Sequence, residues 1–389
     1  MAQEFDRAQL EELTEFVKTE ALRLGFSRVG ITTPDPPPHI EVYESWLNEG
    51  RHGEMAYLGT ERARHRRADP QEILPECASI LVVAANYLPH GFKGKGVAVG
   101  DDCKGRVAAY AVGDDYHDVL TDRLKQLVSG LEARLGREIK SRYYTDTGPL
   151  LERELAQRAG LGWIGKNTCL ISPEHGSYFF LAEVLLDLPL EPDQPIKTDH
   201  CGECTLCIEA CPTSCILPDR TLDATRCISY LTIELKGTIP LELRPLTQDW
   251  VFGCDICQQV CPWNLRFAEP TTDHAFQTRA FLQEPSPGDF LQLSPENYRE
   301  ELSKSPLKRA KRAGLLRNAA VAAGNSGDRS SVPALVSLLA EEGDPIPRAH
   351  AAWALGRLGE IEALRAALDS EQDPEVLAEI RLALDGLEG

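Results

Sequence analysis

Two runs of cysteines carry the clearest chemistry in this 389-residue sequence. The first lies in HCGECTLCIEACPTSC, residues 200–215, where four cysteines have the spacing C-x2-C-x2-C-x3-C and a proline follows. Bacterial ferredoxins hold [4Fe–4S] clusters with this spacing, and the fourth cysteine of each run ligates the neighbouring cluster. Zinc sites usually place their C-x2-C pairs farther apart. The spacing therefore predicts iron–sulfur chemistry.

The second run, CDICQQVCP at residues 254–262, is the same motif without its first cysteine, because Val251 occupies that place. Two clusters need eight thiolates, and the two runs together supply seven. Cys227 in RCISYL is the favoured eighth ligand, and Cys215 is its rival. Exchange of the fourth cysteines then predicts one cluster on Cys201, Cys204, Cys207 and Cys261, and a second on Cys211, Cys227, Cys254 and Cys257.

The three remaining cysteines, Cys77, Cys103 and Cys169, have no partner at ligand spacing. Isolated cysteines are usually small buried hydrophobes, and we expect that role for them.

Composition predicts a globular protein of two or three domains, with 42% hydrophobic and 26% charged residues. No apolar run approaches the roughly 18–20 residues of a membrane span. The acidic, amphipathic N-terminus does not resemble a signal peptide, so we expect a cytoplasmic protein that contacts no membrane. In that reducing compartment, twelve cysteines favour metal binding over disulfides.

The formal net charge of −19 argues against bulk attraction to nucleic acid. Two local stretches are basic although the chain as a whole is acidic. KSPLKRAKRAGLLR, residues 304–317, carries six Lys or Arg and no acid, and RARHRR, residues 62–67, is a second basic run.

The elements that must position these groups fall into four segments. Helices alternate with strands across residues 1–195, which predicts an α/β domain. Residues 196–268 would form a ferredoxin-like domain ordered by its metal centres, and residues 269–306 a polar connection. Residues 307–389 contain similar helical stretches at a period of about thirty residues, which predicts a HEAT-like all-α domain; a plain helical bundle is the alternative.

Within the α/β domain the sequence predicts short strands at RVGIT, SILVVAANYLP, REIKSRYY and SYFFLAEVLLDLPL. It predicts a long amphipathic helix over 115–136 that stops at Gly136. A further helix is expected in PLLERELAQRAGLGW, with Pro149 in its first turn.

The motifs HCGECTLCIEACPT, RCISYLTIELKGTIP and GCDICQQVCPWN closely resemble the epoxyqueuosine reductase family. YYTDTGPLLERELAQRAGLGWIGKNT resembles its cofactor-domain signature, and SPLKRAKRAGLLRNAAVAAGN and HAAWALGRLG resemble the extension of its longer members. The resemblance covers nearly the whole chain. It implies a bacterial enzyme with cobalamin and two [4Fe–4S] clusters that reduces the epoxide of epoxyqueuosine to the alkene of queuosine in tRNA, the last step of queuosine synthesis. The cobalamin-binding role of the α/β domain rests on this resemblance.

The resemblance also assigns the eight cysteines as above, since Cys215 falls where the family more often has alanine. Asp146 matches the family's proposed general acid. From the residues alone, an Asp before Thr-Gly-Pro is more often a turn residue or a helix N-cap. A carboxylic acid can supply the proton if burial raises its pKa, and we expect such a site for Asp146.

Further cofactor contacts are expected around Asp146. Arg153 on the following helix could reach the same site, or it could be an ordinary solvated Arg. In GWIGKN, Gly165 would let the backbone approach a flat macrocycle, and Lys166 and Asn167 would offer donors; an ordinary turn is the alternative. The remaining contacts implied for the cofactor are Ala109, at a corrin-facing position that is a cysteine in some relatives, and Leu170, Arg66, Glu234 and Lys236.

For the tRNA partner, the natural phosphate contact is the stretch 304–317. Lys304, Lys308 and Lys311 would share one helical face, with Arg312 and Arg317 nearby. The alternative is a solvated basic face. A flipped wobble base would then enter the corrin pocket.

Two other functions fit parts of the sequence. The first is a corrinoid iron–sulfur reductase of dehalogenase type acting on a small molecule. The second is a non-enzymatic electron-transfer scaffold, which leaves the α/β domain without a purpose. For the enzyme, a low-potential donor such as a ferredoxin or a flavodoxin is expected as electron partner, and family behaviour implies a monomer.

Overall fold

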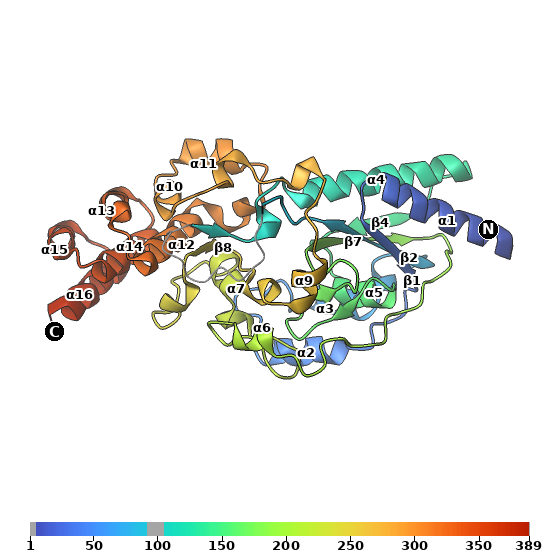
Figure 1. Ribbon diagram of the computed structural model, residues 1–389, viewed down its shortest axis with the longest axis horizontal. Helices are drawn as coiled ribbons and strands as arrows, with labels where there is room; N and C mark the ends of the chain where they lie inside the picture. The colour runs from blue at the N-terminus through green and yellow to red at the C-terminus, as the bar shows by residue number, and fades with distance from the viewer. Residues whose placement is uncertain (1–4, 92–104, 389) are drawn as a thin grey trace.

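The computed structural model describes residues 5–91 and 105–388 and shows an elongated chain whose two termini lie at opposite ends of its long axis (Figure 1). Cys103 lies outside the described residues. No helix in the described ranges is long and apolar enough to cross a membrane.

A four-stranded sheet forms the centre of the N-terminal region. Its order is β1-β2-β7-β4, and every neighbouring pair is antiparallel. The strands are β1 (Arg28–Thr32), β2 (Ser79–Asn86), β7 (Phe179–Leu186) and β4 (Ser141–Tyr144). All four occupy segments in which the sequence predicts strands. Alternation of helices and strands along the chain does not by itself indicate this antiparallel pairing, which joins residues as far apart in sequence as Ser79 and Leu186.

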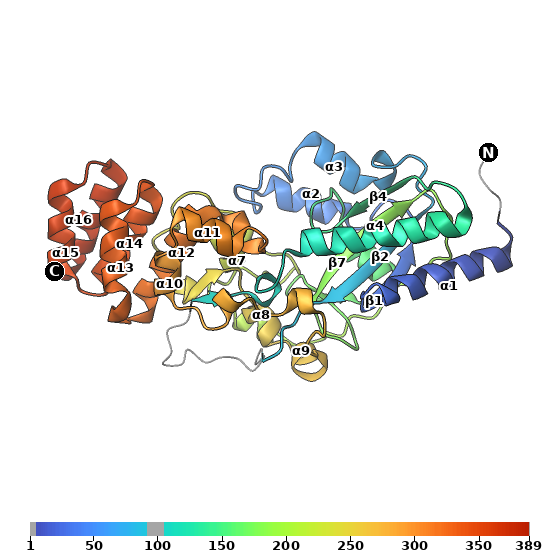
Figure 2. The ribbon, with the colours of Figure 1, turned by 90° about the horizontal axis from the view of Figure 1, so that it is seen from above.

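Helices cover both faces of the sheet (Figures 1 and 2). On one face, α1 (Arg7–Arg23) and α4 (Tyr116–Leu135) pack with Ala182 and Val184 of β7 in one hydrophobic cluster. On the other, α5 (Glu152–Arg158) packs with Leu185. Because side chains alternate along a strand, Glu183 shares the face of Leu185 and is directed towards α5.

Helix α4 follows the sequence prediction closely. Its N-cap Asp115 accepts a hydrogen bond from the backbone N–H of His117, and Gly136 ends the helix at φ 64°. Helix α5 differs from the prediction because it begins only at Glu152, so Pro149 precedes it. Residues 145–151 form a separate loop between β4 and α5, and Asp146 lies in that loop at φ 53°.

The cysteine-bearing region is built from short elements. They are α6 (Leu206–Glu209), α7 (Ile228–Ile233), β8 (Trp250–Phe252), α8 (Ile256–Gln259) and α9 (Pro262–Phe267). β8 pairs in parallel with β3 (Arg106–Val107), and β5 (Trp163–Ile164) pairs with β6 (Leu170–Ile171) in a small hairpin. The connection after β1 contains α2 (Ile40–Asn48) and α3 (Glu61–Ala68).

Helices fill the C-terminal region in two layers. One layer contains α12 (Lys311–Ser326), α14 (Pro345–Arg357) and α16 (Pro374–Glu388), and the other α13 (Val332–Glu341) and α15 (Ile361–Ser370). Before them come α10 (Pro287–Leu291) and α11 (Pro295–Leu302).

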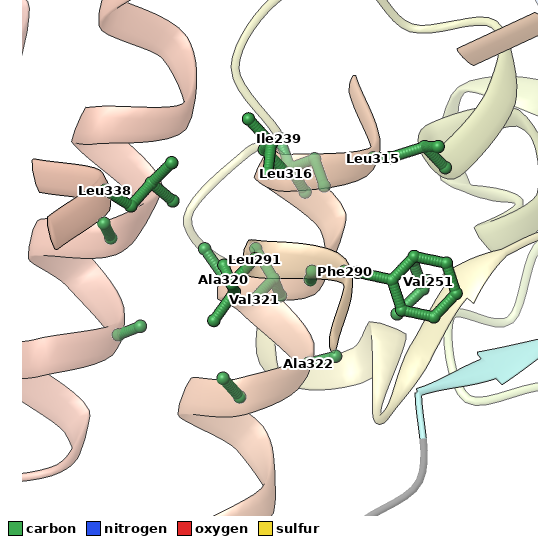
Figure 3. Packing of buried hydrophobic residues seen from close by; sticks show 14 of the residues in the cluster. Ile239, Val251, Phe290, Leu291, Leu315, Leu316, Ala320, Val321, Ala322 and Leu338 are labelled. Carbon is green, nitrogen blue, oxygen red and sulfur yellow. The ribbon is translucent and has the colours of Figure 1, made fainter. Parts of the chain in front are cut away.

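The C-terminal helices share a core with the cysteine-bearing region. Figure 3 shows Leu315, Leu316 and Val321 of α12 packed with Ile239 and Val251. Phe290 of α10 joins the same cluster and is fully buried. One continuous core therefore spans the expected limits at residues 268 and 306, and the four expected segments stay a prediction.

Candidate functional site

The first cysteine group contains Cys201, Cys204, Cys207 and Cys261 and lies around the start of α6. Burial, together with the neighbouring thiols of Cys201, Cys261 and Cys204, raises the pKa of the Cys207 thiol to about 11. Cys261 also belongs to a small apolar cluster on which Cys201 packs. The last cysteine of the second run therefore lies with the first three cysteines of the first run.

The second cysteine group contains Cys211, Cys227, Cys254 and Cys257. Cys211 is the last cysteine of the first run, and Cys254 and Cys257 are the first two of the second run. Burial raises the pKa of Cys254, and the nearby thiols of Cys227 and Cys211 contribute in the same direction. Cys254 and Cys227 likewise raise the pKa of Cys257. Among the described residues, no three His, Cys, Asp or Glu side chains converge tightly enough for a single metal ion. A [4Fe–4S] cube binds one thiolate at each of four iron corners, so its ligands stand farther apart than the ligands of one ion.

Two further cysteines lie at the second group. The Sγ of Cys215 is 3.4 Å from that of Cys211. A hydrogen bond with Cys169 is the largest cause of the raised pKa of Cys257. The expectation of an isolated, purely apolar Cys169 is therefore wrong, because the β5–β6 hairpin brings it against the second group. Cys77 is buried as expected, with its Sγ 3.4 Å from the carbonyl oxygen of Ser79.

Aromatic residues connect the second cysteine group with Asp146. Tyr110 packs on the same small cluster as Cys254. Its ring centroid is 6.2 Å from that of Tyr116. The Tyr116 hydroxyl donates a hydrogen bond of 2.8 Å to Oδ2 of Asp146. The candidate acid and a set of candidate cluster ligands thus lie on either side of two tyrosines.

Asp146 itself is exposed, which corrects the expectation of a buried acid. Its side chain does not cap α5, whose N-cap is Leu151. Instead, the Asp146 backbone N–H donates to Oε1 of Glu152 at 2.7 Å. Burial, and next the charge of Asp146, raise the pKa of Glu152 to about 8. Glu152, which holds the Asp146 backbone, is therefore a carboxyl with a raised pKa beside the expected acid.

The turn of the β5–β6 hairpin lies beside the cysteine loops, but its side chains differ from their expected roles. A Cβ on Gly165 would meet the side chain of Ile171 at 2.5 Å, so close packing inside the hairpin explains the glycine. Lys166 donates to the carbonyl oxygens of Gly202 and Cys204 at 2.7 and 3.0 Å. This Lys supports the first cysteine loop, and a contact between it and a macrocycle stays a prediction.

Asn167 and Arg153 are also engaged within the protein. Asn167 is buried, accepts the Cys169 N–H at 3.2 Å and donates to the carbonyl oxygen of Cys257 at 3.5 Å. Arg153 is exposed and donates to the carbonyl oxygen of Thr168 at 2.5 Å. The same nitrogen also lies 3.2 Å from the Thr168 hydroxyl, so Arg153 links α5 to the hairpin.

Leu170 and Ala109 are buried at 3% and 1% exposure. Leu170 packs in the core beneath α5, which makes it a core residue in this structure. The Ala109 N–H donates to Oδ2 of Asp255 at 2.6 Å, so this small residue fixes the backbone beside the second cysteine group.

Glu234 lies on the Asp146 side of the site. Its carboxylate accepts two hydrogen bonds from Arg309, at 2.8 and 3.0 Å. Arg309 also lies over the ring of Tyr57, at 5.7 Å from the ring centroid. The charges of Asp146, Glu234 and Arg309 all act on Tyr110, whose pKa burial raises most. Residues from five separate segments therefore converge here.

Lys236 and Arg66, the last two expected cofactor contacts, have neighbours within the protein, and their cofactor roles stay predictions. Lys236 donates to the carbonyl oxygens of Ile233 and Arg309, at 2.9 and 3.4 Å, and so caps the end of α7. Arg66 lies on α3 and lines a surface hollow with Glu61, Arg62, His65 and Glu72. The described contacts around Asp146 do not include Arg66.

The basic stretch 304–317 does not form the single helical face that its spacing predicts. A 3₁₀ turn, Pro306–Ala310, interrupts it, and Lys311 at φ 60° starts α12. Lys304, Lys308, Arg309 and Lys311 are exposed. Lys308 pairs with Asp115 at 2.6 Å, and Arg312 pairs with Glu342 at 2.7 Å.

Arg317 cannot contact tRNA in this fold, which corrects that prediction. It is 1% exposed and donates to the carbonyl oxygens of Leu231, Leu235 and Gly237 at 2.6–2.8 Å. It thereby satisfies carbonyl groups around the end of α7. Its apolar neighbours in RAGLLRNAAVAA were the available signal that this arginine is buried.

Removal of the charge of Lys311 and removal of the charge of Arg317 should affect different properties. Lys311→Ala should weaken tRNA binding and reduce the slope of log affinity against log salt by about one, because one phosphate contact is lost. Arg317→Met should leave the slope unchanged and lower the free energy of unfolding by about 2–4 kcal/mol, because buried carbonyls lose their donors. Binding titrations at several salt concentrations and urea unfolding measure both quantities. An unchanged slope for Lys311→Ala would remove this Lys from the tRNA interface.

Several residues at the site had no assigned role in the sequence. They are Tyr57, Tyr110, Tyr116, Glu152, Glu183 and Arg309. Only Glu183 carried a visible signal, as a charged residue within the apolar run FFLAEVLL. The others are joined by contacts across long sequence separations.

Comparisons with known proteins show the family to which the chain belongs. The family model described as "Epoxyqueuosine reductase QueG, DUF1730" matches residues 67–147, "4Fe-4S double cluster binding domain" matches 200–264, and "HEAT repeats" matches 307–385. An epoxyqueuosine reductase from Pseudomonas aeruginosa is 42% identical over 350 residues, which cover 90% of this chain and 95% of that protein. The chain belongs to the epoxyqueuosine reductase family. The predicted fold class, with its double-cluster domain and HEAT-like helices, is confirmed.

Two solved epoxyqueuosine reductases are also similar over nearly the whole chain. One, crystallised with an epoxyqueuosine-modified tRNA-Tyr stem loop, is 31% identical with a TM-score of 0.88 and covers 97% of this chain and 99% of its own. The other, from Bacillus subtilis, has its catalytic aspartate loop swung out of the active site. It is 31% identical with a TM-score of 0.87 and the same coverage.

Proposed function

We propose that this chain reduces epoxyqueuosine to queuosine in tRNA. The observation that carries the proposal is the junction formed by Tyr110 and Tyr116, which connects Asp146 with the second cysteine group. Conversion of an epoxide to an alkene consumes two electrons and two protons and releases the oxygen as water. The reaction therefore needs an electron supply and a proton donor at one place, and this junction offers candidates for both.

The double-cluster domain supports two [4Fe–4S] clusters, and membership of the epoxyqueuosine reductase family supports cobalamin as the further cofactor. The residues between the second cysteine group and Asp146 suit a flat macrocycle. Ala109 has a small side chain, Tyr110 offers an aromatic ring, and Asp146 and Arg153 are exposed polar groups. We infer that these four residues would hold cobalamin. When bound, cobalamin supplies a strongly reducing centre at the epoxide carbon.

Residues of this chain donate a proton and position its donor. Asp146 supplies one of the two protons to the departing oxygen, as a positioned carboxylic acid can, and solvent that reaches the exposed loop supplies the other. Tyr116 fixes the Asp146 carboxyl through a hydrogen bond of 2.8 Å. The loop that carries Asp146 is exposed, so the acid can reach a nucleoside that enters from solvent.

The ligand sets follow the two cysteine groups. We assign Cys201, Cys204, Cys207 and Cys261 to one cluster, and Cys211, Cys227, Cys254 and Cys257 to the other. The mutual effects of their thiols on one another's pKa support this division. The second set adjoins Tyr110, so the second cluster is the one that would pass electrons to the reaction centre.

For tRNA, the exposed cations of the basic stretch suit the phosphate backbone. Lys304, Lys308 and Lys311 remain candidates, and Arg309 replaces Arg317. A relative crystallised with a tRNA stem loop supports tRNA as the partner. A ferredoxin or flavodoxin as electron donor, a monomeric state and a cytoplasmic location complete the proposal.

Tyr116→Phe should lower kcat by about tenfold, because the hydrogen bond that orients the Asp146 carboxyl is lost while the ring remains. KM for tRNA should be unchanged. Steady-state kinetics with epoxyqueuosine-bearing tRNA measures both constants. A rise in KM with unchanged kcat would instead place Tyr116 in substrate binding.

The function itself is tested with the anaerobically reconstituted full chain, a low-potential reductant and tRNA that bears epoxyqueuosine. Nucleosides are quantified with and without cobalamin, and the Pseudomonas aeruginosa relative serves as positive control. Queuosine that forms only with cobalamin is the expected result. No queuosine from a chain with both clusters and bound cobalamin, while the relative is active, would overturn the proposal.

A further inference from the structure

Glu183 is a charged residue in the middle of a buried strand. It is 0% exposed and pairs with Val82 of β2 and Tyr144 of β4 in the sheet register. Neither of its carboxyl oxygens has a hydrogen-bond partner of ordinary geometry among the described residues. A buried unpaired carboxylate is costly, so this position favours the protonated acid. Burial raises the pKa of Glu183 well above its ordinary value, and the neighbouring Glu152 is the next cause.

Glu152 lies between Glu183 and the Asp146 loop. It is the first residue of α5, which packs on β7, and it is partly accessible. Its carboxyl interacts with that of Glu183, while its Oε1 accepts the Asp146 N–H at 2.7 Å. Asp146 is held at φ 53°, a conformation that a residue with a side chain rarely adopts without support. The Glu152 carboxyl provides a contact that favours it.

The charges around this pair are few. Asp146 raises the pKa of Glu152 and Arg153 lowers it, after burial as the main cause. In the sheet register Val82 is apolar and Tyr144 is titratable, and the buried Tyr116 of α4 also lies near enough to Glu152 to interact with its charge. With a pKa of about 8, Glu152 is mostly protonated at pH 7 and ionises as the pH rises through 8. The pair is therefore mostly neutral at physiological pH.

We propose that Glu152 and Glu183 form a neutral carboxyl pair that positions Asp146 and allows it to become an anion when it donates its proton. The role rests on the proposed function. A neutral pair holds the Asp146 backbone without placing a second negative charge beside it. An ionised Glu152 would oppose the loss of the proton from Asp146 through like-charge repulsion. Glu152 is thus a positioning residue, and Glu183 supports it from the sheet.

Glu152→Gln and Glu154→Gln are matched variants for the kinetic test. Gln at 152 keeps an oxygen acceptor and cannot ionise. Glu154 is a buried acid of the same helix that accepts the backbone N–H of His39 at 3.3 Å. For the wild-type enzyme with cobalamin and both clusters bound, and for Glu154→Gln in the same state, kcat should fall as the pH rises through about 8. For Glu152→Gln, kcat at pH 7 should stay within about threefold, and the fall near pH 8 should disappear.

A non-isosteric variant separates positioning from charge. Glu152→Leu removes the acceptor for the Asp146 N–H, so kcat should fall about 10- to 100-fold at every pH while KM for tRNA stays constant. Its iron content and unfolding curve report whether the fold is retained. A fall near pH 8 that persists in Glu152→Gln, or a folded Glu152→Leu with the wild-type kcat, would overturn the proposal.

Infrared spectroscopy tests the pair without turnover. The loaded full chain at pH 7 should show protonated-carboxyl bands, one of which is lost as the pH rises through about 8. Glu152→Gln should remove the pH-dependent band and Glu183→Gln a persistent one, whereas Glu154→Gln should keep both. The same spectra in wild type and both pair variants would contradict a neutral pair. This result stands whether or not queuosine forms, so it separates failure of the pair from failure of the proposed function.

Discussion

Replacement of Asp146 by asparagine is expected to lower kcat for queuosine formation by about 10²- to 10⁴-fold, the usual contribution of a general acid. Asparagine keeps the shape of the side chain, and its amide can still contact the Tyr116 hydroxyl. It has no acidic proton to give to the departing oxygen. Affinity for tRNA should change by less than about threefold, because phosphate contacts supply most of it. Single-turnover nucleoside analysis and a binding titration measure the two effects.

Asp122→Asn is the matched control for this prediction. Asp122 is an acid of α4 whose side chain is 68% exposed and pairs with Lys125. The substitution makes the same change of charge away from the site and should leave kcat unaltered. If Asp146→Asn were nearly as active as the control, the proton would have to come from another group, and Tyr116 would be the first to test.

Cys227→Ala should remove the second cluster and abolish queuosine formation. The expected iron content falls from about eight to about four per chain, because a cube with three thiolates is poorly held. Electron supply to the Asp146 site is lost with it, since the second cysteine group is the one that adjoins Tyr110. Iron analysis and electron paramagnetic resonance of the reduced protein measure the clusters directly.

Cys215→Ala is the control that distinguishes the two candidate ligands. Cys215 lies 3.4 Å from Cys211, sulfur to sulfur, so proximity alone does not separate it from Cys227. It should retain about eight irons and most of the activity. The reverse outcome, with iron lost in Cys215→Ala and kept in Cys227→Ala, would exchange the two cysteines in the second cluster.

The elements that depend on local pattern were predictable from the sequence. The apolar run at β2, the long amphipathic helix α4 and its stop at Gly136 all lie where periodicity and capping place them. The cysteine spacing also predicted which thiols would gather, because the motif is local and the exchange of fourth ligands follows from it.

The remaining features depend on contacts between distant segments. Nothing near Lys166 indicates that its partners are the carbonyl groups of Gly202 and Cys204. Arg317 was read as part of a basic surface, but carbonyl groups some eighty residues away hold it inside the protein. Local charge patterns report composition and helical spacing, whereas burial is decided by the packing of α12 on α7 and β8.

The site around Asp146 was likewise only partly predictable from the sequence. Asp146 was predicted from a resemblance, and its exposed position and φ of 53° were not. Glu183 stood in the sequence as an acid within an apolar strand, but its partner Glu152 becomes visible only when α5 packs on β7. A charge that breaks an apolar pattern is therefore a useful signal, although its role requires the fold.

In the proposed mechanism the clusters supply electrons to a site where Asp146 protonates the departing oxygen. To test this mechanism, the chain that carries cobalamin and both clusters is reduced, excess reductant is removed and one equivalent of epoxyqueuosine-bearing tRNA is added. Queuosine and reduced clusters are then measured in the same samples over time. Queuosine should appear as the reduced centres lose two electrons per product, and neither change should occur without cobalamin. Reduced centres that stay reduced while queuosine forms, or that lose electrons without forming it, would overturn this mechanism.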